Sequence, residues 1–276
     1  MTATGAGPGA PAARDGTAGV RIPEGADLLA ALEAGAVRAA HPDAAAAGGW
    51  RVDHAVKAAI LRCFADRTPV ETVAGPLRFR DRAGLPLHRL ADPDVRVVPG
   101  GTSVRAGAHL APGVVVMPPS FVNVGAWIGE ATMVDSHVLV GSCAQVGARV
   151  HLAAGAILGG VLEPPGARPV IVEDDAFVGA GVLLLEGVLV GAGAVMGAGV
   201  TLTGTSRLYD LVDGRVLAGT PEAPLAVPPG SVVVPGSRPL AGPFATEHGL
   251  GVMVALLVKC RDAGTDARVA LEEALR

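Results

Sequence analysis

Large aromatic side chains are scarce in this sequence. Phe, Tyr and Trp make up 3% of the 276 residues, with a single Tyr and two Trp. A core of stacked rings is therefore excluded, and the interior must pack with smaller side chains. Cysteine is scarce too, since Cys63, Cys143 and Cys260 are odd in number and far apart. This pattern argues against a disulfide framework or a cysteine-rich zinc site, and it favours a reducing, cytoplasmic environment.

Excess positive charge and long uncharged apolar runs are also absent. The net charge of -4 gives no reason to expect nucleic acid or an anionic membrane as a partner. Half of the chain is hydrophobic, yet no uncharged run approaches the roughly 20 apolar residues that a membrane span requires. The start of the chain lacks the basic region and apolar block of a signal peptide. Its Gly, Ala and Pro content predicts a disordered tail over residues 1–20.

Two helical patterns follow the tail. Leu and Ala recur at three- and four-residue spacing in DLLAALEAGAVRAA and in DHAVKAAILRCF, where Asp53 is suited to cap the helix. HPDAAAAGGW supplies breaks between them, and a polar connecting stretch continues to about residue 94. The sequence therefore predicts a small helical N-terminal domain over residues 21–94, with no recognisable chemistry.

A six-residue period then takes over. It gives eleven successive apolar residues without a miss, and after GGVLEPPGARP it resumes for six more. The jump of fourteen residues between the two runs, from 158 to 172, indicates a short inserted loop. The periodic residues are Val98, Val104, Leu110, Val116, Val122, Ile128, Val134, Val140, Val146, Leu152, Leu158, Val172, Val178, Leu184, Val190, Met196 and Leu202.

Six-residue periodicity is the signature of the hexapeptide β-helix. Three units form one triangular coil, in which the apolar residue points inward and the next position takes Gly or another small residue at the corner. The coils stack, so strands pair between coils and the interior fills with layered Val, Leu and Ile. We predict a mainly β chain, with a β-helix over residues 95–236 and a strand and helix in a C-terminal extension over residues 237–276.

Several segments resemble the tetrahydrodipicolinate N-succinyltransferase family. They are RVVPG, VVMPPSFVNVGAWIGEATMVDSHVLVGSCAQVG, VHLAAGAILGGVLEPPGARPVIVEDDAFVGA, LYDLVDGRV and VPPGSVVVPGS, with GWRVDHAVKAAILRCF before them. The resemblance implies left-handed β-helices in a homotrimer, with active sites between subunits and CoA in the groove along two prisms. It also implies an enzyme of lysine and diaminopimelate synthesis without a permanently bound cofactor. Its co-substrate would be succinyl-CoA or another acyl-CoA.

The resemblance also assigns site residues. It places the family's motif acid at Asp135 and a substrate-binding arginine at Arg96. Amine attack on a thioester needs an unprotonated amine, anchored carboxylates and a donor near the oxyanion. Asp135 can accept the amine proton, and Arg96 offers the fork geometry for a carboxylate. From the pattern alone, Asp135 is equally a corner acid bonded to backbone amides, and Arg96 is equally a solvated residue. CoA contacts would fall on Gly199, Gly204 and Lys259, and a plain surface position is the alternative for Lys259.

One stretch departs from the family. Where the family continues GARSEVVEG, residues 179–187 of this chain read GAGVLLLEG. Gly181 thus replaces an Arg, Val182 a Ser and Leu183 a Glu, whereas Glu186 matches the family's second Glu and remains a candidate catalytic residue. Losing an Arg and a Glu together indicates a change of site chemistry, or drift that another position compensates.

Two histidines need separate interpretations. His137 stands two residues after Asp135, where the family usually carries a bulky aromatic residue. It either has a structural role or takes over the proton from Asp135. His137 and His151 lack the paired spacing of a three-histidine zinc site, so no metal is predicted.

The sequence therefore favours a trimeric, acyl-CoA-dependent N-acyltransferase that transfers succinyl to the amine of tetrahydrodipicolinate. One alternative is a divergent relative that acylates a different amino acid in specialised metabolism. Another is a β-helical trimer that has lost catalysis. The GAGVLLLEG stretch is the feature that discriminates among these hypotheses.

Overall fold

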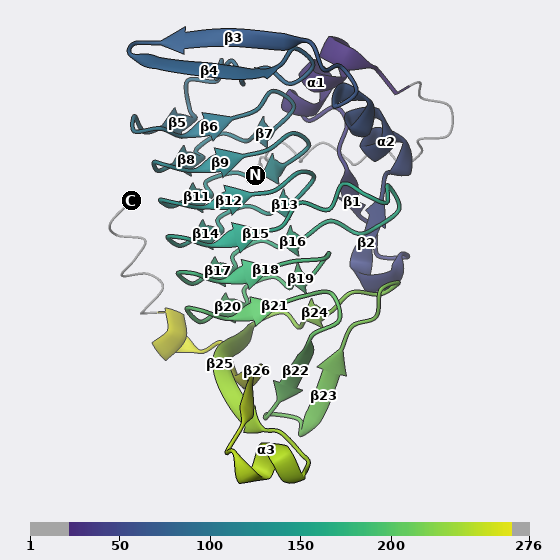
Figure 1. The fold of residues 1–276 in the computed structure, drawn as a ribbon, viewed down its shortest axis with the longest axis vertical. Coiled ribbons are helices and arrows are strands. Elements are labelled where there is room, and N and C mark those ends of the chain that lie inside the picture. Colours follow the sequence, from purple (N-terminus) through teal and green to yellow (C-terminus); the bar gives the residue numbers. More distant parts are fainter. Residues whose placement is uncertain (1–21, 267–276) are drawn as a thin grey trace, which may run out of the picture.

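The structure, a computed structural model, describes residues 22–266. Its main body is a three-sided prism of stacked two-residue strands (Figure 1). Each strand pairs in parallel with strands one coil above and below, so Met133 pairs with both Val115 and His151. Partners in uninterrupted coils are therefore eighteen residues apart, which is three hexapeptides. The fold is the left-handed parallel β-helix that the sequence predicted.

The three faces of the prism alternate along the chain. Face one consists of β5 (Arg96–Val97), β8 (Val115–Val116), β11 (Met133–Val134), β14 (His151–Leu152), β17 (Phe177–Val178) and β20 (Val195–Met196). Face two consists of β6 (Ser103–Val104), β9 (Phe121–Val122), β12 (Leu139–Val140), β15 (Ile157–Leu158), β18 (Leu183–Leu184) and β21 (Thr201–Leu202). Face three consists of β7 (His109–Leu110), β10 (Trp127–Ile128), β13 (Gln145–Val146), β16 (Ile171–Val172), β19 (Leu189–Val190) and β24 (Ala226–Val227).

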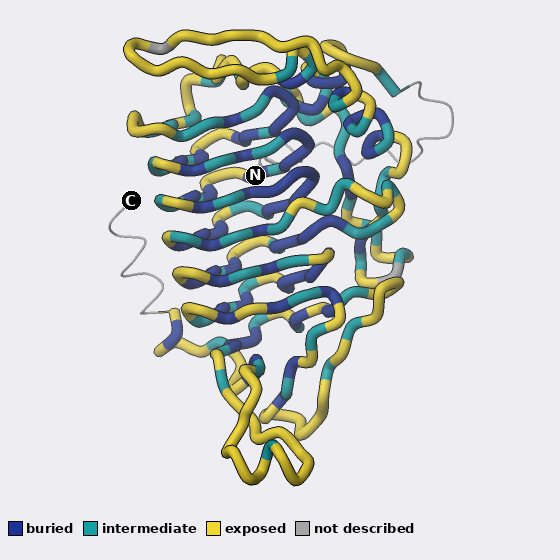
Figure 2. The backbone as a smooth tube through the Cα atoms, viewed as in Figure 1, coloured by how far each residue is buried: buried dark blue, intermediate teal, exposed yellow. Residues whose placement is uncertain are grey.

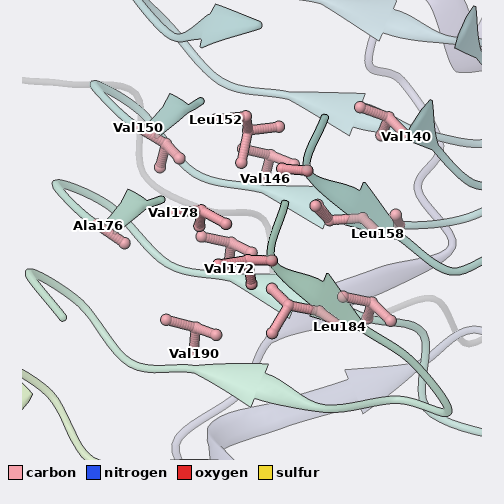
Figure 3. Packing of buried hydrophobic residues seen from close by; sticks show 14 of the residues in the cluster. Val140, Val146, Val150, Leu152, Leu158, Val172, Ala176, Val178, Leu184 and Val190 are labelled. Atoms are coloured by element: carbon pink, nitrogen blue, oxygen red, sulfur yellow. The ribbon is translucent and has the colours of Figure 1, made fainter. Parts of the chain in front are cut away.

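Two inward rows per face fill the prism. The second residue of every strand on the three faces except β5, such as Val140 or Leu184, is buried. A second row lies two residues earlier and holds small side chains such as Val150 and Ala176, which are also buried. Figure 3 shows these layers in contact, and Figure 2 shows the buried ladder running through the stack. Small and β-branched residues thus replace the aromatic core that the composition excludes.

Glycine follows the inward residue where coils approach most closely. A Cβ on Gly129 would lie 2.5 Å from the carbonyl carbon of Gly147, and one on Gly141 would lie 2.2 Å from the nitrogen of Gly160. In both cases the nearest atoms belong to the backbone of the next coil, which cannot move out of the way as a flexible side chain can. These contacts explain the small corner residue that the sequence predicted.

The first coil departs from the predicted frame. Val97, and not Val98, pairs with the inward Val116 and packs against the core. Val97 lies seven residues before Val104, so the chain carries one extra residue in this corner. The prediction for Val98 was wrong because an insertion in the first unit of a repeat leaves no earlier unit to reveal it.

The N-terminal layer covers face three (Figure 1). Its elements are α1 (Gly25–Glu33), β1 (Ala40–Pro42), η1 (Ala47–Gly49), β2 (Trp50–Val52) and α2 (His54–Cys63). Asp53 caps α2 as predicted, since its Oδ1 accepts the N–H of Val56 at 2.9 Å. The indole N–H of Trp50 donates to Glu173 at 2.8 Å, which ties this layer to the prism.

Two expectations for this N-terminal region were wrong in detail. The first helix ends at Glu33, and Gly35, with φ of 72°, leads the chain into β1 instead of continuing the helix. The stretch that was expected only to connect forms an exposed hairpin of β3 (Pro69–Ala74) and β4 (Leu77–Arg82). Its short strands carry several charged residues, which masked the strand pattern.

The base of the prism is closed by strands that extend face one. Their order is β23, β22, β26, β25 and then β20. Leu208, Ala255 and Leu257 from these strands are buried against the core. The proposed domain limit at residue 236 falls inside β25. The base elements are β22 (Arg207–Asp210), β23 (Arg215–Ala218), β25 (Ser231–Pro239), α3 (Pro243–Glu247) and β26 (Gly251–Cys260).

The expected strand in the C-terminal extension is present as β26. Helical backbone follows at residues 263–266, and the rest of the expected helix lies outside the described residues. The tail predicted for residues 1–20 lies outside them as well. Within residues 22–266, no helix is both long enough and apolar enough to span a membrane.

Candidate active site

Asp135 lies on the edge between faces one and two, which we call the one–two edge. This edge consists of the corners 117–119, 135–137, 153–155, 179–181 and 197–199, and backbone hydrogen bonds join each corner to the next. The bonds run from His137 to Pro119, from Gly155 to Ser136, from Gly181 to Ala154 and from Gly199 to Ala180, at 2.7–3.0 Å.

The carboxylate of Asp135 is half-buried at its corner. Its Oδ1 accepts the backbone N–H of Ser136 at 2.6 Å, which is the local bond expected of a corner acid. Its Oδ2 makes no hydrogen bond to any residue in the described part of the chain. One oxygen therefore holds the turn, as the corner interpretation expects, while the other makes no hydrogen bond in the described structure. The role of Asp135 as a proton acceptor stays a prediction.

Ser120 fixes this corner from inside the prism, and the sequence reasoning missed it. Its hydroxyl donates to the backbone oxygen of Asp135 at 2.8 Å and accepts the N–H of Val138 at 3.1 Å. Thr132 makes the equivalent bonds to Gly147 and Val150 two corners further along the chain. The sequence signal that could have revealed Ser120 is its hydroxyl, because the inward row to which it belongs on face two is filled by Ala and Val in the later coils.

His137 occupies the outer tip of the same corner. Its φ is 63°, in the left-handed region that favours glycine, and its side chain is exposed. The ring makes no hydrogen bond or ion pair with residues 22–266, so no contact links it to Asp135. The equivalent tips in the three lower coils are Gly155, Gly181 and Gly199, all with positive φ. Below His137 the edge is therefore lined by backbone and small side chains.

The departure from the family changes this edge. A Cβ on Gly181 would meet no atom within 4 Å, so the site that the family fills with Arg is open. Leu183 points outward from face two, half-buried between Ile157 and Thr201 of the neighbouring strands. Val182 between them is fully buried and belongs to the core. The two changed surface positions are therefore small or apolar.

Arg96 and Glu186 do not meet Asp135 within one subunit. Arg96 is exposed on β5, and β8 separates β5 from the β11 strand that precedes Asp135. At about 4.8 Å per strand, this places the two levels roughly 10 Å apart. Glu186 is exposed at the edge between faces two and three, across the whole of face two from Asp135.

The candidate CoA contacts differ in their surroundings. Gly199 lies on the one–two edge, where its Cβ position is open. A Cβ on Gly204 would lie 2.5 Å from the backbone oxygen of Glu186, so packing alone accounts for that glycine. Lys259 donates to Asp262 at 2.7 Å, and this bond, with those from Thr265, holds the pKa of Asp262 below its usual range. The roles of all three in CoA binding stay predictions.

No group of three His, Cys, Asp or Glu residues between positions 22 and 266 is placed to hold an ion. What the one–two edge presents is a single carboxylate oxygen above a run of small residues, with backbone groups alongside. That arrangement suits proton transfer beside an extended ligand.

Residues 169–204 match the family model described as "Hexapeptide repeat of succinyl-transferase". The prism and this match place the chain among the hexapeptide-repeat acyltransferases.

Sequence comparison narrows the class. Three curated relatives, each named 2,3,4,5-tetrahydropyridine-2,6-dicarboxylate N-succinyltransferase, come from Xylella fastidiosa, a Methylobacterium species and Acinetobacter baylyi. They are 39%, 41% and 40% identical to this chain over 90%, 90% and 91% of its length, and over 86%, 87% and 88% of theirs. The chain belongs to the 2,3,4,5-tetrahydropyridine-2,6-dicarboxylate N-succinyltransferase family.

Proposed function

We propose that the protein transfers a succinyl group from succinyl-CoA to the amine of 2,3,4,5-tetrahydropyridine-2,6-dicarboxylate (tetrahydrodipicolinate). The observation that carries this proposal is the carboxylate of Asp135, which keeps one oxygen available on an exposed edge. The names of the relatives supply the acyl group and the acceptor. The reaction would belong to lysine and diaminopimelate synthesis in the cytoplasm.

Asp135 would act as the proton acceptor. The ring nitrogen of the acceptor is an imine, so water first adds across its C=N bond and converts it to an amine with a proton. The amine nitrogen then attacks the thioester carbonyl, and its proton passes to the carboxylate. The C–N bond forms, the C–S bond breaks, and the proton ends on the departing CoA thiolate. Asp135 then returns to its ionised state. The bond from Ser136 to Oδ1 keeps the carboxylate oriented through these steps.

The assembly proposed for this activity is a homotrimer. Face three is covered by the N-terminal layer, but face two presents an uncovered row of half-buried Phe121, Leu139, Ile157 and Leu183. Face one presents a second apolar row that includes Val115, Met133 and Phe177. Packing faces of neighbouring copies together would remove both rows from water.

A trimer would also complete the site. Within one chain, Glu186 lies across face two from Asp135, so a contribution from it needs a second copy. Arg96 lies on the same face as the strand before Asp135, two strands away. Arg96 would then bind a carboxylate of the acceptor through its planar fork. Leu183, on face two, would face the one–two edge of a neighbour.

Residues 181 and 183 favour a second class of acceptor, an amine with one carboxylate instead of two. The open position at Gly181 and the apolar side chain of Leu183 provide no partner for a second carboxylate. The matching alternative is acylation of an amine that bears one carboxylate, which would place the protein in specialised metabolism. Loss of catalysis is less favoured, because Asp135 keeps an available oxygen.

An acceptor screen tests the proposal. The full chain is incubated with succinyl-CoA or acetyl-CoA and a set of amines, and thiol release and acylated products are followed. The set pairs tetrahydrodipicolinate and its stable analogue 2-aminopimelate with monocarboxylate amines of similar length. Acceptor-dependent thiol release with a succinylated dicarboxylate supports the proposal. Turnover only with monocarboxylates supports the alternative acceptor, and release with none contradicts acyl transfer.

A further inference from the structure

Two arginines at the base of the prism lack carboxylate partners. Residues 200–266 contain five Lys and Arg side chains. Arg215 pairs with Asp210 and Asp213, Lys259 with Asp262, and Arg261 with Asp266. Arg207 and Arg238 are the two that remain, and neither side chain makes a hydrogen bond or ion pair within the described residues.

Arg207 and Arg238 line one cavity of about 300 Å³. The hydroxyl-bearing residues Thr201, Thr205, Ser206 and Tyr209 line it as well, with Val252, Met253, Val254 and Ala255 from β26. No carboxylate lines this cavity among the described residues. Two unpaired guanidinium groups beside several hydroxyls form a donor-rich site of a kind that suits phosphate oxygens.

The strand register places both arginines on the same face of the sheet. Leu208 is opposite Ala255, and both are buried against the core. Arg207, one residue earlier, therefore lies on the outward face, beside Val254. Arg238 is opposite Val252, which lies on the same face as Val254 because strand side chains alternate.

The spacing of the two arginines suits a single anion. They lie on β22 and β25, and β26 runs between these strands. Two strand spacings of about 4.8 Å put the backbones roughly 10 Å apart. Both side chains are long enough to reach one phosphate group from opposite sides. The valines of β26 form the floor between them.

The cavity lies at the lower end of the one–two edge. Thr201, which lines it, follows Gly199 by two residues. The corner of Gly199 is three coils below that of Asp135, through β14, β17 and β20, which is about 14 Å at the usual strand spacing. The intervening corners hold only Ala and Gly. An extended ligand could therefore lie along the edge, with its reactive end at Asp135 and an anionic end at the arginines.

We infer that Arg207 and Arg238 bind a terminal phosphate of the acyl-CoA donor, an inference that rests on the acyl transfer proposed above. The sequence reasoning nominated Lys259 for a phosphate contact, but Lys259 is already paired with Asp262. A phosphate could also come from free inorganic phosphate, which has the same chemistry without the pantetheine arm. The 3′-phosphate of CoA distinguishes the two sources, because CoA can be prepared without it.

The experiment compares succinyl-CoA with its 3′-dephospho form. Steady-state KM and kcat are measured for the unmodified chain, Arg207→Gln, Arg238→Gln and the double variant. Arg78→Gln, in the exposed β4 strand, is the matched control because Arg78 also has no ion pair with residues 22–266. We expect each base variant to raise the KM for succinyl-CoA about tenfold, the size of one lost charge-assisted contact. The KM for the dephospho form and kcat should stay unchanged.

Direct binding separates this inference from the proposed reaction. Calorimetry with CoA, 3′-dephospho-CoA and inorganic phosphate needs no turnover, so it tests the cavity even if acyl transfer fails. A preference for CoA over dephospho-CoA that disappears in the double variant supports the inference. It is overturned if the preference survives in that variant, if the unmodified chain shows none, or if inorganic phosphate alone binds through these arginines. Light scattering and thermal melting confirm that each variant remains folded and assembled.

Discussion

The hydroxyl of Ser120 and the backbone oxygen of Asp135 lie 2.8 Å apart, and the donor is inside the prism while the acceptor belongs to its edge. The same hydroxyl accepts the N–H of Val138. Ser120 therefore holds both ends of the corner that presents the proposed proton acceptor. The candidate site inherits its geometry from the repeat rather than from a separate loop.

Replacing Ser120 with Ala should destabilise the protein. Two buried backbone groups would lose their partner, at a cost of about 1–3 kcal/mol. Urea denaturation measures this loss, with Ser103→Ala as the control. Ser103 is half-buried on face two, and its hydroxyl makes no hydrogen bond in the described structure. Equal stability of the two variants would show that the Ser120 hydroxyl does not hold the corner.

The apolar row on face two predicts assembly. Light scattering of the unmodified chain should give three times the 27.4 kDa of one subunit. Ile157→Arg places a charge in the middle of the row, between Leu139 and Leu183, and burying it without a partner is costly. We expect this variant to be largely monomeric at micromolar concentration.

The control for this assembly test is Val73→Arg in the exposed hairpin, which should remain a trimer. A monomer mass for the unmodified chain would contradict both the assembly and a shared site. A trimer that tolerates Ile157→Arg would exclude face two from the interface.

Residues 181 and 183 should set acceptor preference. A carboxylate held against Leu183 would lose hydration without gaining a partner, a penalty of roughly a few kcal/mol. This corresponds to about two or three orders of magnitude in acceptor discrimination. A monocarboxylate amine should then react faster than 2-aminopimelate, and Gly181→Arg with Leu183→Glu should shift preference toward the dicarboxylate.

The measurement is kcat/KM for both acceptors with both proteins. Efficient use of the dicarboxylate by the unmodified chain would show that another group binds the second carboxylate. The assignment to lysine synthesis would then stand without this change of specificity.

The N-terminal layer should weaken in mild acid. His109 stacks on Trp127 with 3.9 Å between ring centroids, and its Nδ1 lies 2.8 Å from the backbone oxygen of Glu33. Burial is the main cause that lowers the pKa of His109 from 6.5, and the nearby charge of Arg38 adds to it. The folded state therefore prefers the neutral ring, so this stability is present above pH 6.5 and is lost as pH falls through the folded pKa.

Thermal melting between pH 7.5 and pH 5 measures this effect. The midpoint should fall with acidification, and His109→Phe should reduce the fall. Burial lowers the pKa of His41 as well, so part of the acid sensitivity should remain in that variant. His248→Phe, at the residue that follows α3, is the control. An identical pH dependence of the melting midpoint in His109→Phe and the unmodified chain would exclude His109 as a source of the acid sensitivity.

The sequence alone was sufficient to predict the structure of the repeat, but not the structure at the ends of the repeat. Each hexapeptide repeats one environment, so Val134 or Leu184 could be placed in the core from spacing alone. Val98 was misplaced because the first unit has no predecessor to reveal its extra residue. The β3–β4 hairpin escaped notice because no buried face gives it a periodic pattern.

The candidate site is likewise divided between residues that the sequence predicted and residues that only the structure brings together. The corner position of Asp135 followed from the apolar residue before it, whereas the support from Ser120 depends on contact between coils. Arg207 and Arg238 are 31 residues apart in sequence and line one cavity only through the register of β22, β26 and β25. Glu186 lies across face two from Asp135 within one chain, so a role for it in the site depends on assembly rather than on local sequence. Arg96 approaches Asp135 only because β5, β8 and β11 are neighbours in one sheet.

The most direct test of the account is succinyl transfer by Asp135→Asn. The substitution keeps the shape of the side chain and the oxygen that bonds Ser136, but it removes the proton acceptor. We predict that kcat falls about 10²-fold or more with the preferred acceptor while the assembly stays intact. Asp174→Asn is the control, because Asp174 also bonds a backbone amide at a corner but lies on a different edge. Transfer by Asp135→Asn at the rate of the unmodified chain would show that Asp135 only holds its turn, and would contradict the mechanism.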